Sequence, residues 1–203
     1  MAIKISERCT TVTFLSRASL NIFLVCAGDS DLTISSSDGV LFKLHRKHLE
    51  VHSDVFADAE NATLPANGAD EVVVLSETSS VLDVLFQYMY RQPQPNLQLV
   101  EFSVFAGVAE AAEKYMVYSA LPAVLIRMRR YLGSYPLQVL DYAARHNYKD
   151  LANKAVRSTV GLTLAEAGKN LSPDTFLKWV RIFYQNYFFF GLHITEKLPG
   201  NFL

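Results

Sequence analysis

Three histidines lie within eight residues near the start of the chain, in the segment HRKHLEVHSD (45–54). Imidazole side chains at steps of three and four could bind a metal ion, transfer protons, or pack against neighbouring elements of the fold. On a helix of about 100° per residue they share a face with apolar side chains. That stripe contains His45, Leu49, His52 and Phe56. The mixture of histidines with apolar residues favours a packing role.

A metal site at His48 and His52 is the main alternative, because residues at i and i+4 on a helix can reach one ion. The segment HLEVH lacks the order of the zinc-protease motif H-E-x-x-H, since its glutamate follows the first histidine by two residues. Zinc also needs a third protein ligand, and only Asp54 or Asp58 is near. We therefore expect no metal ion and no other cofactor.

No other pattern in the sequence predicts catalysis. The chain has two cysteines, too few for a disulfide framework or a cysteine zinc site. Cys9 has no predicted partner base, and Cys26 lies in an apolar run where a thiol is usually inert. A glycine-rich phosphate loop, a G-x-S-x-G turn and an E-x-x-H pair are all missing from the sequence. We expect a non-catalytic protein in a reducing compartment, the cytoplasm, the nucleus or both.

The overall composition limits the classes of partner. The chain of 203 residues is half hydrophobic and 19% charged, with a net charge of −1. Such a chain can bury a sizeable core, whereas a nucleic-acid-binding domain usually has a strong basic bias. No apolar stretch reaches the ~20 residues that a membrane helix needs. We expect neither nucleic acid nor membrane as a partner.

Residues 1–27 are ambiguous. The apolar run from Ala18 to Cys26 fits a helix or a strand equally well. Basic residues before this run also give a weak likeness to a signal peptide, although the apolar part is short. We treat residues 1–27 as an N-terminal extension.

The segment 31–45 predicts a β-hairpin, because two β-prone runs flank Asp38-Gly39, a strong turn signal. A helix pair follows, and then EVVVLS (71–76), a strand without alternation that suggests burial on both faces. The remaining elements to Gly133 are helices at 81–90, 101–117 and 120–132, with a short extended piece at 96–99.

Beyond Gly133-Ser134 the patterns predict only helices, at 136–147 and 149–160 and in a long segment that starts at Ser172-Pro173-Asp174. We therefore predict an α+β fold in which helices cover a small mixed sheet, followed by an all-α extension. The expected divisions are 1–27, 28–133 and 134–203.

Aromatic residues crowd the last predicted helix. One face would contain Trp179, Phe183, Tyr187 and Phe190. This face could pack on the preceding helices, or it could form a surface for a partner protein, where aromatic anchors are favoured.

The order and spacing of several residues resemble the BTB/POZ domain family. The resemblance covers about residues 30–132. Its signature is matched by Asp31, Phe42, His45, Arg46, Leu49, Ser53, Phe56, Tyr90 and the Ala112-Glu113-Lys114-Tyr115 segment. The resemblance implies a structural role for six of these positions, namely Phe42, His45, Leu49, Ser53, Phe56 and Tyr90. The tail resembles the extensions that follow this domain in short fungal members of the family.

The resemblance also implies a function, that of a protein–protein interaction module which self-associates, often as a homodimer. Asp31 and Arg46 occupy the positions that line a charged pocket near the dimer groove in dimeric members. The alternative is a plain surface pair of little energetic weight. A second implied role is that of a cullin-bound ubiquitin-ligase adaptor, although residues 59–71 lack a convincing hydrophobic-x-Glu element.

Overall fold

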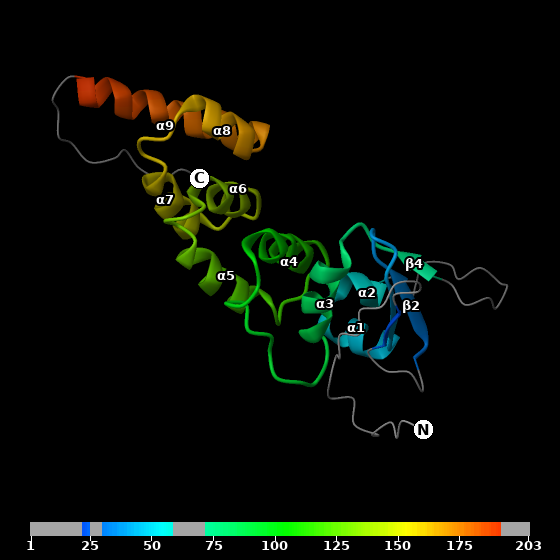
Figure 1. Ribbon diagram of the computed structural model, residues 1–203. Coiled ribbons are helices and arrows are strands. Elements are labelled where there is room, and N and C mark those ends of the chain that lie inside the picture. The colour runs from blue at the N-terminus through cyan, green and yellow to red at the C-terminus, as the bar shows by residue number, and fades with distance from the viewer. Residues whose placement is uncertain (1–21, 25–29, 59–71, 192–203) are drawn as a thin grey trace. The chain divides into compact units, whose positions relative to one another are not determined.

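The computed structural model describes the backbone of residues 22–24, 30–58 and 72–191, and side chains within 30–58 and 72–184 (Figure 1). The chain divides into two compact units, Met1–Val124 and Leu125–Leu203. The interpretations of Cys9, Cys26 and the loop 59–71 lie outside the described residues. No helix among the described residues is both long enough and apolar enough to cross a membrane.

Among the described residues, unit 1 contains a mixed sheet of four strands with the order β1-β3-β2-β4. The strands are β1 (Ile22–Leu24), β2 (Leu32–Ser35), β3 (Leu41–Leu44) and β4 (Val72–Val74). The β2 and β3 strands pair antiparallel, whereas β1 pairs parallel with β3 and β4 pairs parallel with β2. The predicted hairpin is present, and Gly39 in its turn has φ +80°, a conformation that glycine adopts without strain.

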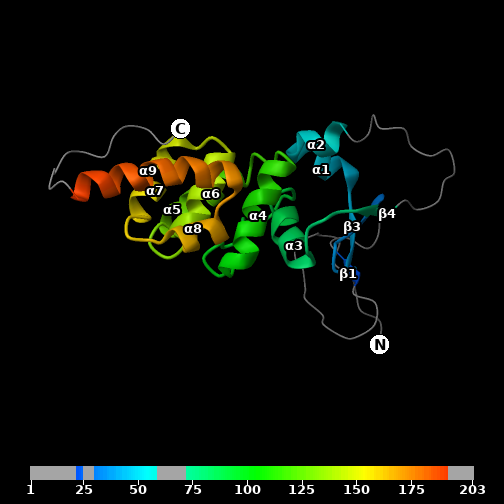
Figure 2. The same ribbon diagram turned by 90° about the horizontal axis from the view of Figure 1, so that it is seen from above.

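Five helices begin in the described part of unit 1. They are α1 (Arg46–His52), α2 (Asp54–Asp58), α3 (Ser79–Gln87), α4 (Phe102–Lys114) and α5 (Leu121–Arg130). The α1, α2 and α3 helices lie on the same side of the sheet (Figures 1 and 2), and α3 packs against α4. Fully buried side chains from the hairpin and the helices, such as Phe42, Leu49, Leu85 and Phe105, form the core. The predicted α+β class is confirmed.

The β4 strand corrects one expectation. The sequence suggested burial on both faces, but Val72, Val73 and Val74 are 43%, 36% and 73% exposed. The prediction was wrong because β4 lies at the edge of the described sheet, where β2 is its only neighbouring strand. Residues 96–99 form a turn rather than an extended piece.

Unit 2 consists of helices in its described part. They are the end of α5, then α6 (Pro136–Arg145), α7 (Lys149–Ser158), α8 (Leu164–Asn170) and α9 (Pro173–Gly191). The α6 and α7 helices pack against each other, and their buried residues include Leu140, Ala143 and Leu151. The α8 helix lies between the segments for which the sequence predicts helices. Thr163 and Glu166 form a capping box at its start, which satisfies backbone N–H groups that a helix leaves unpaired.

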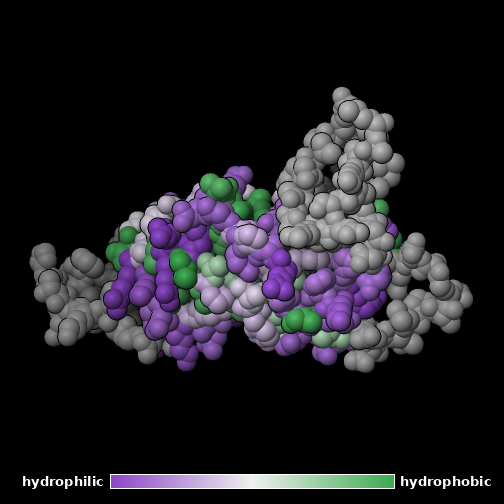
Figure 3. All heavy atoms as spheres, turned by 90° about the horizontal axis from the view of Figure 1, so that it is seen from below, coloured by the Kyte–Doolittle hydropathy of each residue, from purple (hydrophilic) through white to green (hydrophobic). Residues whose placement is uncertain are grey.

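The two compact units divide within α5, between Val124 and Leu125. The sequence places the domain boundary after residue 133, and that boundary stays a prediction. On the face of the molecule in Figure 3, exposed hydrophobic side chains form small separate patches on a largely hydrophilic surface.

Candidate functional site

The first histidine of the opening segment lies where the hairpin ends and α1 begins. The backbone N–H of His45 donates to the Tyr90 hydroxyl oxygen at 3.0 Å, and His45 Nδ1 lies 3.3 Å from the same oxygen. The His48 ring lies 4.7 Å from the Tyr90 ring, between centroids. Tyr90 is buried at the end of the segment that follows α3. These contacts tie the start of α1 to a distant part of unit 1, which fits the packing role expected for His45.

A metal site would need several ligands close together. In the described part of the chain, no three His, Cys, Asp or Glu side chains are grouped so that they could hold a metal ion. His52 is half-buried at the end of α1, whereas His48 is exposed. His45 and His48 therefore pack the start of α1 on Tyr90, whereas His52 lies at the other end of the helix.

Asp31 and Arg46 lie together, but not as an ion pair. The Arg46 backbone N–H donates to Asp31 Oδ1 at 2.8 Å, so the carboxylate satisfies one of the amides that the first turn of α1 leaves unpaired. No ion pair joins the Asp31 carboxylate to the Arg46 guanidinium in the described part of the chain. Asp31 has a structural role here that the sequence did not reveal.

The next motif residues attach α1 and α2 to the end of α4. Leu49 is fully buried. The Ser53 hydroxyl donates to the Tyr115 carbonyl oxygen and accepts from the Phe56 N–H at 3.2 Å. The Phe56 ring stacks on the Tyr115 ring at 5.2 Å between centroids. Residues that are far apart in the sequence thus meet around Tyr115.

Tyr115 also belongs to a charged network that sequence reasoning missed. Its hydroxyl donates to Glu77 Oε2 at 2.6 Å, and Lys114 Nζ lies 2.8 Å from Glu77 Oε1. Burial raises the pKa of Glu77, but hydrogen bonds from Lys114, Tyr115 and Ser76 outweigh it and lower the pKa overall. Burial and the bond to Glu77 raise the pKa of Tyr115 to about 12. The network fixes the segment after β4 against the end of α4.

Asp38 in the hairpin turn caps α3. Its Oδ1 accepts from the Ser79 N–H at 2.8 Å, and its Oδ2 accepts from the Ser79 hydroxyl at 2.6 Å. The capping carboxylate comes from the hairpin turn, 41 residues away in the sequence, and no local signal indicates it. Burial raises the pKa of Asp38, but hydrogen bonds from Ser36 and Ser79 outweigh it and lower the pKa overall.

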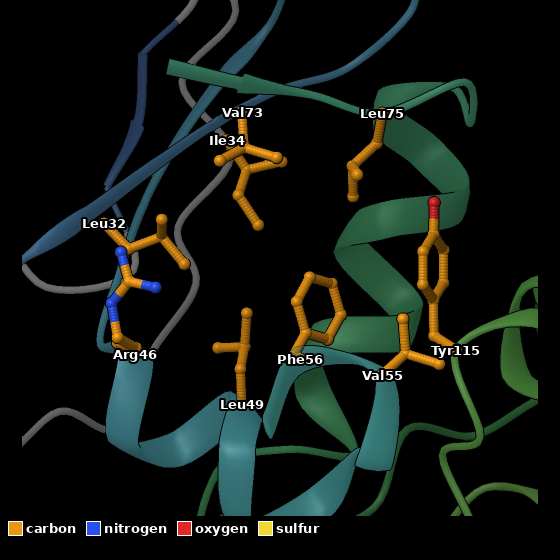
Figure 4. A pocket seen from close by; sticks show the side chains of 9 residues that line it. All are labelled: Leu32, Ile34, Arg46, Leu49, Val55, Phe56, Val73, Leu75 and Tyr115. Carbon is orange, nitrogen blue, oxygen red and sulfur yellow. The ribbon is translucent and has the colours of Figure 1, made fainter. Parts of the chain in front are cut away.

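A cavity of about 210 Å³ lies between the sheet and the first two helices (Figure 4). Its walls are formed by Leu32, Ile34, Arg46, Leu49, Val55, Phe56, Val73, Leu75 and Tyr115. The side chains from the strands face those from α1 and α2 across the space in Figure 4, and the Arg46 guanidinium lies at the Leu32 end. Apolar side chains and one guanidinium line this cavity. It could therefore bind an apolar group that has a negative charge on it or next to it.

The aromatic face of α9 is only partly described. Trp179 is buried in unit 2, and its Nε1–H donates to Thr159 Oγ1 at 2.7 Å. This favours packing within unit 2 over a partner surface for Trp179. Phe183 is half-buried, 5.0 Å from the Trp179 ring between centroids. The side chains of Tyr187 and Phe190 lie outside the described residues, so their partner surface stays a prediction.

The fold and these contacts define an α+β domain in which a hairpin and a helix cluster share one core and surround an apolar cavity. Comparison with family models gives the family of this domain. Residues 24–124 match the BTB/POZ domain model, and through these residues the chain belongs to the BTB/POZ family. The BTB/POZ domain is a protein–protein interaction module. No curated protein matches the chain.

Proposed function

We propose that the BTB/POZ domain of this chain forms a homodimer through the face that contains Asp31 and α1. The observation that carries the proposal is the state of the two charges. The Asp31 Oδ1 atom accepts a hydrogen bond from the Arg46 backbone N–H. The Arg46 guanidinium has no acidic partner in the described part of the chain. A two-fold axis would bring each guanidinium to the carboxylate of the other copy, making two equivalent ion pairs.

Apolar surface on the same helix supports this proposal. Val51 on α1 is 72% exposed. A lone exposed valine is common on a protein surface, but on the helix that begins at Arg46 it offers an apolar contact of the kind that a dimer interface needs.

The test is the molar mass of the full chain, measured by light scattering after size exclusion over a hundredfold range of concentration. Asp31→Ala removes both the charge and the cap of α1, so it confounds assembly with stability. Asp31→Asn keeps an oxygen that can accept from the Arg46 N–H but removes the charge. We expect Asp31→Asn to weaken the dimer while the circular dichroism of the protein stays the same.

A matched control is Asp58→Asn, which removes one exposed carboxylate from the end of α2. We expect it to leave the dimer intact. Val51→Lys should weaken the dimer as Asp31→Asn does. A wild-type protein that stays monomeric, or a dimer that survives both changes, would contradict the proposal.

A role as cullin-bound adaptor is the second candidate, favoured by one observation. Two packed helices, α6 and α7, follow the BTB/POZ domain, and family members that act as adaptors carry a helical pair at this place. The test is capture of a purified cullin by the immobilised full chain. Binding that is lost on Asp31→Asn would link the two roles, and no binding at micromolar concentrations would eliminate the adaptor role.

A further inference from the structure

The outer edge of β4 is open in the described sheet. On its inner side β4 pairs parallel with β2, in the register Thr33↔Val72, Ile34↔Val73 and Ser35↔Val74. It ends the strand order β1-β3-β2-β4, so no described strand pairs with its other side. The N–H and C=O groups on that side point where a further strand could hydrogen-bond to them.

The composition of β4 favours such pairing. Edge strands of soluble proteins usually carry a charge, a proline or a bulge that prevents the addition of another strand. Residues 72–75 contain none of these. Three consecutive valines, each at least 36% exposed, give instead a strand with high β propensity and an apolar surface.

We propose that β4 pairs antiparallel with β4 of a second copy, about a two-fold axis through Val73. This axis sets Val73 opposite its own copy and Val72 opposite Val74 of the other chain. An uncharged strand of one residue type is complementary to itself in this register, because every cross-strand pair is valine with valine. Two four-stranded sheets would then join into one continuous sheet.

The cavity gives a second, independent reason. Val73 and Leu75 line it from the sheet, together with Ile34 (Figure 4). In an antiparallel pair, directly opposite residues project from the same face of the sheet. Val73 of the second copy would therefore lie beside Val73 on the face that lines the cavity, and would cover apolar wall that is open in the single chain.

This inference goes beyond the proposed dimer, because it uses β4 and not Asp31 or α1. A three-residue strand pair offers a small contact area, and we therefore expect an association that depends on concentration. Used together, the two surfaces would link dimers to one another and form species of four or more chains.

The experiment uses two double variants of the full chain, Val72→Lys/Val74→Lys and Val72→Glu/Val74→Glu. Both positions are exposed and alternate with Val73, so the changes leave the cavity wall in place. In the proposed register each lysine opposes a lysine, and each glutamate a glutamate. The control is Leu99→Lys, which alters a side chain that is 85% exposed in a turn of unit 1. Circular dichroism and the urea midpoint check folding.

We expect each double variant alone to associate at least about tenfold more weakly than the wild type, because like charges face each other. We expect an equimolar mixture of the two to recover the wild-type mass, and Leu99→Lys to match the wild type. The mixing step reports on the register itself, since only opposed strands with opposite charges regain attraction.

Two results would overturn the inference: double variants that associate as the wild type does, or a mixture that fails to regain the wild-type mass although both variants fold. The proposed dimer fails separately, when Asp31→Asn and Val51→Lys leave the mass unchanged. A wild-type dimer that is lost only in the β4 variants would support this inference and eliminate the α1 interface.

Discussion

The Tyr90→Phe variant tests how the first histidine is held. The change removes one oxygen atom from a side chain that is 9% exposed. That oxygen accepts the His45 backbone N–H at 3.0 Å and lies 3.3 Å from His45 Nδ1. The ring remains, and so does its contact with His48. The variant therefore isolates the hydrogen bonds from the aromatic contact.

The expected loss of stability depends on how deeply the groups that bond to the Tyr90 hydroxyl are buried. An unsatisfied buried donor costs about 1–3 kcal/mol. His45 is half-buried, so water can replace part of the lost interaction. We expect the free energy of unfolding to fall by about 1–2 kcal/mol, which lowers Tm by about 2–8 °C in a chain of this size.

The assay is urea unfolding followed by far-ultraviolet circular dichroism, because the single tryptophan reports on unit 2 alone. Tyr118→Phe is the matched control. Its hydroxyl bonds to Asp54 at 3.2 Å, but Tyr118 is 57% exposed, and we expect a change within about 0.5 kcal/mol. Equal losses in the two variants would refute the argument that Tyr90 secures the hairpin-to-helix corner.

Two further predictions concern the carboxylates that sequence reasoning missed. Asp38→Ala should lower the free energy of unfolding by about 1 kcal/mol through loss of the α3 cap, whereas Asp58→Ala should be nearly neutral in the same urea titration. The pKa of Glu77 is lower in the folded protein than the value of 4.5 for the unfolded chain. The ionised carboxylate therefore stabilises the fold above pH 4.5, and this stabilisation is lost as the pH falls below 4.5. Glu77→Gln should therefore flatten the fall in Tm between pH 5 and pH 3, and an unchanged slope would eliminate this role.

Much of the fold could be predicted because its signals are local. Asp38-Gly39 specifies a hairpin turn, and Pro122, Pro136 and Pro173 lie in the first turns of helices. Helical periodicity located α3, α4, α6, α7 and the start of α9 to within a few residues. Each of these features depends on residues only a few positions apart.

The remaining features depend on contacts between distant segments. A valine run is typical of a strand buried on both faces, and only the strand order shows that β4 lies at an edge. Glu77 looks like one more polar residue in a loop, because its partners Lys114 and Tyr115 come from the far end of α4. Hydrophobic periodicity carries no information about such pairs.

The two aspartates of the hairpin show why a motif residue cannot be assigned to function from its position alone. Asp31, before β2, accepts the first amide of α1, and Asp38, in the turn, accepts the first amide of α3. One hairpin thus fixes the starts of two helices. A weaker assembly after Asp31→Ala would follow from a loosened α1 as readily as from a lost charge at an interface. Only Asp31→Asn, which keeps the acceptor oxygen, separates the two causes, and an Asn variant that assembles normally would make Asp31 a helix cap alone.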